Sequence, residues 1–229
     1  MVNRAGLMGD MANIYLNPSV LNTNWDELPQ IISQIKADSD FVHLDVMDNK
    51  FVPNQTFTFE RAKEIISKST LPVDAHLMII DPDEMAPKYA KAGAASVTVH
   101  LEAVKDFART INEIRINGAK VGVALKPKTQ LVDVIPYLPD LDLLLIMTVE
   151  PGFGGQSFME DQVAKIRAAR FEIEKLNLQI LLQVDGGITK ETIKIAKDAG
   201  ANCFVAGNAV FKSENPNKTL KQLRAIASI

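Results

Sequence analysis

Short apolar segments alternate with longer amphipathic segments along this chain, and the alternation repeats eight times. Because strands that alternate with helices pair in parallel through right-handed crossovers, this pattern predicts an α/β protein with a parallel sheet. The first helical segment shows the periodicity clearly, since Leu28, Ile31, Ile32 and Ile35 have the i, i+3, i+4, i+7 spacing. Strands are expected at residues 14–21, 41–46, 73–77, 96–100, 120–125, 143–147, 180–185 and 203–206. Helices are expected at residues 26–37, 60–68, 83–92, 104–117, 130–138, 159–176, 189–199 and 216–227.

A parallel sheet of this kind is either an open doubly wound sheet or a closed barrel. Eight strands, with no GxGxxG fingerprint after the first of them, favour the closed barrel, and 229 residues are typical of one. We therefore predict a (β/α)8 TIM barrel in a single domain, residues 11–229. Residues 1–10 precede a second methionine and the first strand, and we interpret them as an N-terminal extension.

Charge and composition narrow the classes of function. The net charge is −3 with no long run of one sign, which argues against a nucleic-acid surface. No apolar run reaches the roughly 18 residues that span a bilayer, so no membrane association is expected. The start of the chain lacks the apolar stretch of a secretory signal. Cys203 is the only cysteine, which excludes an intramolecular disulfide and fits a reducing, cytoplasmic compartment.

Ionisable side chains gather at the ends of three predicted strands. His43 and Asp45 share one face of the second strand, His76 ends the third, and Asp185 ends the seventh. The active sites of TIM barrels lie at these carboxyl ends. One histidine at a strand end is more often a satisfied polar group than a ligand. Two imidazoles and two carboxylates together would be costly to bury without a partner, and they predict a site for a divalent transition metal.

His100 ends the fourth predicted strand beside Glu102. It has three possible roles: to support the predicted metal ligands, to contact substrate, or simply to fill space.

Glycine-bearing loops follow three consecutive strands, at residues 151–156, 185–187 and 206–209. Glycines let backbone N–H groups approach an anion closely, and TIM barrels often bind phosphate in the last loops. These loops therefore predict a phosphate site. Met47, Met78 and Met147 also fall at strand ends, either as core packing or as an apolar cover over a water-poor site.

Six segments, in order, resemble the ribulose-phosphate 3-epimerase family. The segments are 18–21 (PSVL), 43–54 (HLDVMDNKFVPN), 74–78 (DAHLM), 147–158 (MTVEPGFGGQSF), 184–188 (VDGGI) and 205–211 (VAGNAVF). The resemblance implies that His43, Asp45, His76 and Asp185 bind one divalent metal ion, Fe²⁺, Zn²⁺, Mn²⁺ or Co²⁺. It also implies that Asp45 and Asp185 are the paired acid and base, that the substrate is a phosphosugar, and that the chain forms a homo-oligomer.

The resemblance assigns binding roles as well. Ser19, together with His76, Met47, Met78 and Met147, is expected to contact the sugar. The phosphate is expected at Gly154, Gly155, Gly186, Gly187, Gly207 and Asn208. The chain departs from the family in several places. Asn49 stands where glycine is common, Asn208 where serine is common, and Asn22-Thr23-Asn24 and Phe57-Thr58-Phe59 replace more usual residues.

The implied reaction is metal-dependent 3-epimerisation of D-ribulose 5-phosphate to D-xylulose 5-phosphate, a step of the pentose phosphate pathway, through an enediolate. One aspartate would remove the C3 proton and the other would return a proton to the opposite face. Three alternatives remain open. The chain could act on a ketohexose phosphate such as allulose 6-phosphate, it could bind a phosphosugar without catalysis, or Lys126 could form a Schiff base.

Overall fold

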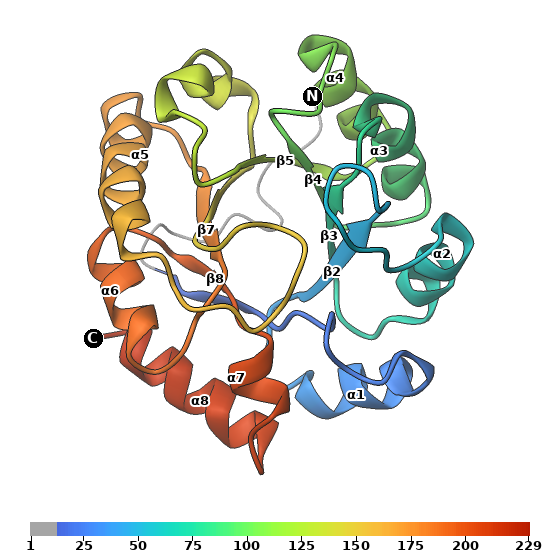
Figure 1. The fold of residues 1–229 in the computed structure, drawn as a ribbon, viewed down its shortest axis with the longest axis vertical. Coiled ribbons are helices and arrows are strands. Elements are labelled where there is room, and N and C mark those ends of the chain that lie inside the picture. The colour runs from blue at the N-terminus through green and yellow to red at the C-terminus, as the bar shows by residue number, and fades with distance from the viewer. Residues whose placement is uncertain (1–12) are drawn as a thin grey trace.

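The computed structural model describes residues 13–229, so the extension predicted at residues 1–10 lies outside the described range. Eight parallel strands form a ring with helices around it (Figure 1). The predicted TIM barrel is confirmed. The strands are β1 (Tyr15–Asn17), β2 (Val42–Met47), β3 (Val73–Met78), β4 (Ser96–His100), β5 (Lys120–Leu125), β6 (Leu143–Met147), β7 (Leu181–Asp185) and β8 (Cys203–Val205).

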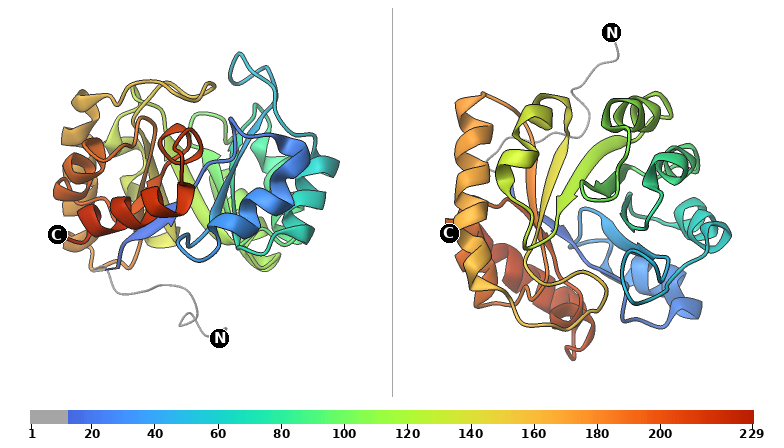
Figure 2. Two further views of the ribbon diagram at one scale, coloured as in Figure 1. Left: turned by 90° about the horizontal axis from the view of Figure 1, so that it is seen from below. Right: turned by 45° about the horizontal axis from the view of Figure 1, so that its top comes forward.

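The helices cover the outside of this ring (Figure 2). They are α1 (Leu28–Ile35), α2 (Phe59–Lys68), α3 (Pro82–Lys91), α4 (Phe107–Ile116), α5 (Val163–Lys175), α6 (Thr192–Asp198), α7 (Asn208–Phe211) and α8 (Pro216–Ala227). The α-helix predicted at 130–138 is replaced by two 3₁₀ helices, η3 (Leu131–Asp133) and η4 (Ile135–Asp140). Pro136 and Pro139 explain the difference, because proline inside an α-helix removes a donor and clashes with the preceding turn. Among the helices of residues 13–229, none combines the length and the apolar character that crossing a membrane requires.

Hydrogen-bonded ladders join the strands in the order β1-β8-β7-β6-β5-β4-β3-β2, and all of them are parallel. Between β1 and β2, a parallel bridge pairs Ser19 with His43. The backbone N–H of His43 donates to Pro18 O at 3.0 Å, and the N–H of Val20 donates to His43 O at 3.2 Å. The barrel therefore closes directly beside a predicted metal ligand.

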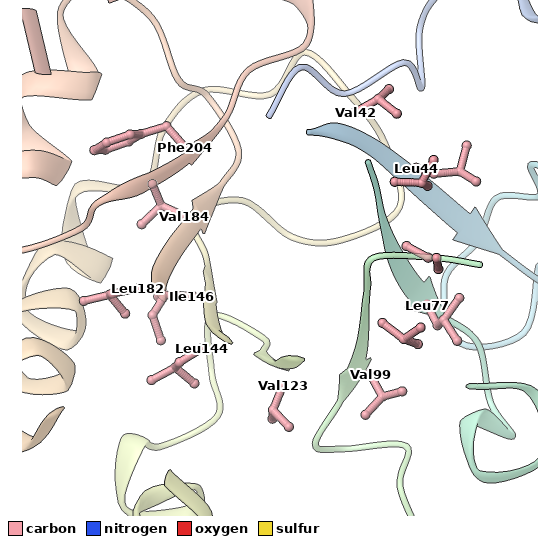
Figure 3. Packing of buried hydrophobic residues seen from close by; sticks show 14 of the residues in the cluster. Val42, Leu44, Leu77, Val99, Val123, Leu144, Ile146, Leu182, Val184 and Phe204 are labelled. Carbon is pink, nitrogen blue, oxygen red and sulfur yellow. The ribbon is translucent and has the colours of Figure 1, made fainter. Parts of the chain in front are cut away.

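The two faces of each strand meet different surroundings. Leu44 and Val46 of β2 pack outward into the main apolar core between the strands and the helices. Figure 3 shows Leu44 in this layer with residues from strands β3 to β8. His43 and Asp45 alternate with them and are buried inside the barrel. This period-2 alternation is what the sequence predicted for β2.

Asp83, in the first turn of α3, holds the loop between β4 and α4. Its carboxylate accepts the backbone N–H of Asp106 at 2.8 Å, that of Lys105 at 3.1 Å, and the Thr110 hydroxyl at 2.8 Å. Burial alone would raise the pKa of Asp83, but these donors outweigh burial and lower it. The negative charge of Asp83 is therefore part of what fixes this loop.

We expect Asp83→Asn to lower the free energy of unfolding by about 1–2 kcal/mol at pH 7. Because the folded pKa is depressed, this contribution is complete above roughly pH 4 and is lost as the pH falls through the folded pKa. Urea unfolding at several pH values tests this. The control is Asp81→Asn, whose exposed ion pair with Lys105 should contribute less than about 0.5 kcal/mol. The prediction would be contradicted if the difference in free energy of unfolding between the wild type and Asp83→Asn were the same at pH 2 as at pH 7.

Candidate metal centre and active site

A cavity of about 310 Å³ opens at the carboxyl ends of the strands. The loop between β6 and α5 and the loop between β2 and α2 rise on this side of the barrel (Figure 2). The lining residues include most of the predicted site, namely Ser19, Asp45, Met47, Met78, Met147, Gly154, Gly155, Asp185, Gly186, Gly187, Gly207 and Asn208. The predicted phosphate residues and the predicted substrate residues other than His76 therefore share one cavity; His76 is fully buried and does not line it.

The four predicted metal ligands converge at the floor of this cavity. One donor atom from each of His43, Asp45, His76 and Asp185 lies within 4.8 Å of all the others. Asp45 Oδ1 lies 3.3 Å from His43 Nε2 and 3.2 Å from His76 Nδ1, and those two nitrogens lie 3.3 Å apart. Asp185 Oδ2 lies 3.9 Å from His43 Nε2 and 3.8 Å from His76 Nδ1.

These separations fit a single cation. Ligand bonds of about 2.1 Å in a tetrahedron place neighbouring donors roughly 3.4 Å apart. The donor set of two neutral imidazoles and two carboxylates is also one that divalent transition metals accept. Among residues 13–229, this is the one group of three or more His, Cys, Asp or Glu side chains with such geometry.

Asp74 fixes the orientation of His43. Its Oδ2 lies 2.9 Å from His43 Nδ1 and accepts a hydrogen bond of 2.9 Å from Gln183 Nε2, while its Oδ1 accepts one of 2.7 Å from Ser96 Oγ. A proton on His43 Nδ1 leaves the Nε2 lone pair free to face the cation. Asp74 is on the inner face of β3, as the alternation indicated, but spacing alone gave it no role.

The two cavity aspartates have opposite pKa shifts. Burial would raise the pKa of Asp45, but the imidazoles of His43 and His76 outweigh burial and lower it well below its usual range. Burial and then the Asp45 carboxylate raise the pKa of Asp185, which reaches about 6. Ser19, placed by the closing bridge, donates its hydroxyl to Asp45 Oδ2 at 2.6 Å. Two neighbouring carboxyls with pKa values pushed apart suit a pair in which one takes a proton and the other gives one.

The glycine loops pack tightly around the outer part of the cavity. Gly187 has φ +65°, and a Cβ there would lie 2.3 Å from the backbone nitrogen of Phe158, so only glycine fits. Asn22, which the sequence analysis did not assign to the site, donates from Nδ2 to Asn208 Oδ1 at 2.9 Å and also lines the cavity. Asn22 and Asn208 are both departures from the usual family residues, and the structure brings them together.

The three methionines are buried as the packing alternative predicts, and their role as an apolar cover stays a prediction. Met47, Met78 and Met147 are at most 2% exposed, as core residues are, and each also lines the cavity. Lys126 does not fit the Schiff-base alternative, since its ammonium lies 3.6 Å from the centre of the Phe51 ring. The part of the cavity lining that the structure describes contains no lysine.

A family model described as the ribulose-phosphate 3-epimerase family matches residues 15–211. The chain belongs to this family. It is 42% identical over 207 residues to the ribulose-phosphate 3-epimerase of Mycobacterium leprae, covering 90% of this chain and 92% of that one. It is 41% identical to the ribulose-phosphate 3-epimerase of Bacillus subtilis, covering 92% and 98%. A chloroplastic ribulose-5-phosphate-3-epimerase of Arabidopsis thaliana is 40% identical, covering 93% and 77%.

Solved structures show that the family fold is shared more widely. The 3-hexulose-6-phosphate synthase of Salmonella typhimurium superimposes with a TM-score of 0.68 at 20% identity, covering 93% of this chain and 98% of that one. The N-(5'-phosphoribosyl)anthranilate isomerase of Pyrococcus furiosus gives 0.61 at 18% identity, covering 94% and 98%. At these identities the likeness establishes the barrel, and the activity has to be argued from the site.

Proposed function

We propose that this protein is a ribulose-phosphate 3-epimerase, which interconverts D-ribulose 5-phosphate and D-xylulose 5-phosphate in the pentose phosphate pathway. The observation that carries the proposal is the convergence of Asp45 and Asp185 with two histidines in one cavity. Relatives that are 40–42% identical over at least 90% of this chain bear the name of this enzyme. Two carboxylates from strands 2 and 7 of the barrel can stand on either side of a planar intermediate.

The reaction inverts C3, which is next to the C2 carbonyl. One aspartate takes the proton from C3, and the electron pair of the broken C–H bond moves into the C2–C3 bond while the carbonyl oxygen becomes negative. The second aspartate then donates a proton to C3 from the opposite face, and the carbonyl re-forms. No atom is gained or lost except the exchanged proton. Ser19 orients Asp45 through its hydroxyl, and the buried methionines exclude water from the sugar.

His43, Asp45, His76 and Asp185 would hold the cation, which is Fe²⁺, Zn²⁺, Mn²⁺ or Co²⁺ by donor type. When bound, it supplies positive charge beside the oxygen that becomes negative in the reaction. Both imidazoles have a polar partner on the ring nitrogen that faces away from this site, Asp74 for His43 and His100 for His76.

We assign the substrate phosphate to the glycine loops. Gly154 and Gly155 follow β6, Gly186 and Gly187 follow β7, and Gly207 and Asn208 follow β8, and all six line the outer cavity. Backbone N–H groups are sufficient donors for a phosphate. The Asn22–Asn208 hydrogen bond places a side-chain amide at the same end of the cavity.

Turnover on ribulose 5-phosphate is the direct test. The purified protein should form xylulose 5-phosphate in a coupled assay, and treatment with a chelator should reduce turnover by at least about 100-fold. Adding back Co²⁺ or Mn²⁺ should restore it. Allulose 6-phosphate is the control substrate, and we expect it to be turned over less efficiently by about tenfold or more. Tight binding of ribulose 5-phosphate without turnover would favour the non-catalytic alternative instead.

We further propose that the protein acts as a homo-oligomer in the cytoplasm. The chain resembles a family that forms oligomers, and its single, buried cysteine suits a reducing compartment. Light scattering of the purified protein tests the first part of this proposal, and a single-chain mass would contradict it. Imaging of a tagged chain in its own cell tests the second.

A further inference from the structure

His100 lies at the end of β4 with no exposed surface, and both of its ring nitrogens face polar partners. Its Nε2 lies 2.9 Å from Nε2 of His76, and its Nδ1 lies 3.3 Å from Oε2 of Glu102. The planes of the His76 and His100 rings are inclined by 28°, and their centroids lie 5.0 Å apart. The chain contains three histidines, and all three belong to this one buried cluster.

The protons in this cluster can be placed from the contacts. Two ring nitrogens 2.9 Å apart need one proton between them, so one donates and the other accepts. Nδ1 of His76 faces Asp45 and His43, and it must keep its lone pair free if it is to bind a cation. The proton of His76 is therefore on Nε2, and it is donated to Nε2 of His100. His100 must then carry its own proton on Nδ1, where Glu102 accepts it.

We propose that His100, held by Glu102, is a positioning residue that fixes the tautomer and ring orientation of His76, so that Nδ1 of His76 is presented to the metal centre. The inference rests on the proposed metal site and deepens it. A metal-binding histidine usually donates its second N–H to a carboxylate, a carbonyl or a water. His43 follows that rule through Asp74, whereas His76 reaches its carboxylate through a second imidazole.

Glu102 is itself firmly placed. Its Oε1 accepts the backbone N–H of Lys126 at 2.8 Å and the hydroxyl of Thr129, while its Oε2 faces His100. Glu102 also belongs to the segment between β4 and α4 that Asp83 holds from α3. The chain of contacts therefore runs from the cation site through two imidazoles to backbone that is anchored in two neighbouring loops.

A purely structural role for His100 makes different predictions. Phe51 lies against the ring of His100, with centroids 4.8 Å apart, so the imidazole also fills space beneath the loop between β2 and α2. If filling space were its whole role, an aromatic replacement of similar size would serve best. If its role is to accept a hydrogen bond from His76, a smaller side chain that has an acceptor atom would serve better than an aromatic side chain that has none.

Nitrogen NMR of the Zn²⁺-loaded wild-type protein tests the tautomers directly. With three histidines in the chain, the ring ¹⁵N signals can be assigned by single replacements. We expect protonated Nε2 on His76 and protonated Nδ1 on His100, with His43 protonated on Nδ1. A His100 ring protonated on Nε2 and not on Nδ1 would overturn the proposal, since His76 could then no longer donate to it.

Titration of the metal-free proteins with Co²⁺ tests the consequence, using the visible absorption of bound Co²⁺ as the readout. We expect His100→Phe to weaken Co²⁺ binding by about 10–100-fold, and His100→Gln, whose amide oxygen can accept from His76, to weaken it less. Thermal unfolding of the metal-free proteins is measured in parallel, because a space-filling role predicts losses that follow stability. Glu102→Met, which keeps the length of the side chain but removes the acceptor that faces Nδ1 of His100, should weaken binding by about tenfold.

The outcomes separate cleanly. Affinity that ranks wild type, then His100→Gln, then His100→Phe supports the proposal. Wild-type affinity in His100→Phe, or losses that follow only the unfolding midpoints, overturns it. If His100→Phe does not fold, Glu102→Met decides alone, and unchanged affinity in that variant overturns the proposal. Failure of the wild-type protein to bind Co²⁺ would instead reject the metal centre itself, and this inference with it.

Discussion

Asp185→Asn should lose epimerase turnover by about 10²–10⁴-fold while keeping its fold. The reason is that Asp45 and Asp185 are the two carboxylates among the described residues that line the cavity, and an amide cannot exchange a proton with C3 in place of Asp185. Coupled-assay turnover is the measurement, with circular dichroism and metal analysis on the same sample. Asp133→Asn is the matched control, because it removes one negative charge from an exposed position in η3.

Loss of turnover alone would not separate a lost proton carrier from a disturbed metal site. Hydrogen exchange in heavy water does. If each aspartate serves one face of the intermediate, Asp185→Asn should still exchange the C3 hydrogen of one epimer through Asp45, without inverting it. Asp45→Asn should exchange the C3 hydrogen of the other epimer through Asp185. Near wild-type epimerisation by Asp185→Asn would show that the two-aspartate scheme is wrong.

The parts of this molecule that follow from local periodicity could be predicted from sequence. Strand alternation placed His43 and Asp45 on the inner face of β2, and the buried apolar partners Leu44 and Val46 confirm it. Because all eight strands are parallel, their polar ends meet at one rim. That is why side chains more than a hundred residues apart, such as Asp45 and Asp185, could be assigned to one site.

Contacts between side chains of different loops could not be predicted in this way. Asn22 meets Asn208 across 186 positions of sequence, and no spacing rule links them. His100 had several possible roles because its partner depends on ring orientation, which only the packed barrel fixes. The 3₁₀ helices near residue 135 had a visible signal in Pro136 and Pro139, but apolar periodicity outweighed it in the prediction.

The two imidazole ligands also differ in the partner of the ring nitrogen that faces away from the metal centre. For His43 this partner is the carboxylate of Asp74, and for His76 it is the imidazole of His100. The His100 imidazole is neutral, since burial lowers the pKa of His100 to about 4. Burial would raise the pKa of Asp74, but its interactions with His43 and its hydrogen bonds from Gln183 and Ser96 outweigh burial and lower it, so Asp74 is a full negative charge inside the barrel. A negative partner increases the basicity of the imidazole it holds. Asp74 should therefore matter more to metal binding than an uncharged acceptor could.

Asp74→Asn tests this, with an expected 10–100-fold loss of Co²⁺ affinity and a comparable loss of turnover at limiting metal. The amide oxygen can still face His43 and Gln183, because the hydroxyl of Ser96 can rotate to accept from the amide nitrogen. The geometry is then kept and only the charge is removed. Co²⁺ titration of the metal-free protein measures the effect. Asp142→Asn is the matched control, since Asp142 accepts the N–H of Val121 at the opposite end of the barrel and should leave Co²⁺ affinity unchanged. If Asp74→Asn bound Co²⁺ as tightly as the wild type, the affinity would depend on the position of His43 and not on the negative charge of Asp74.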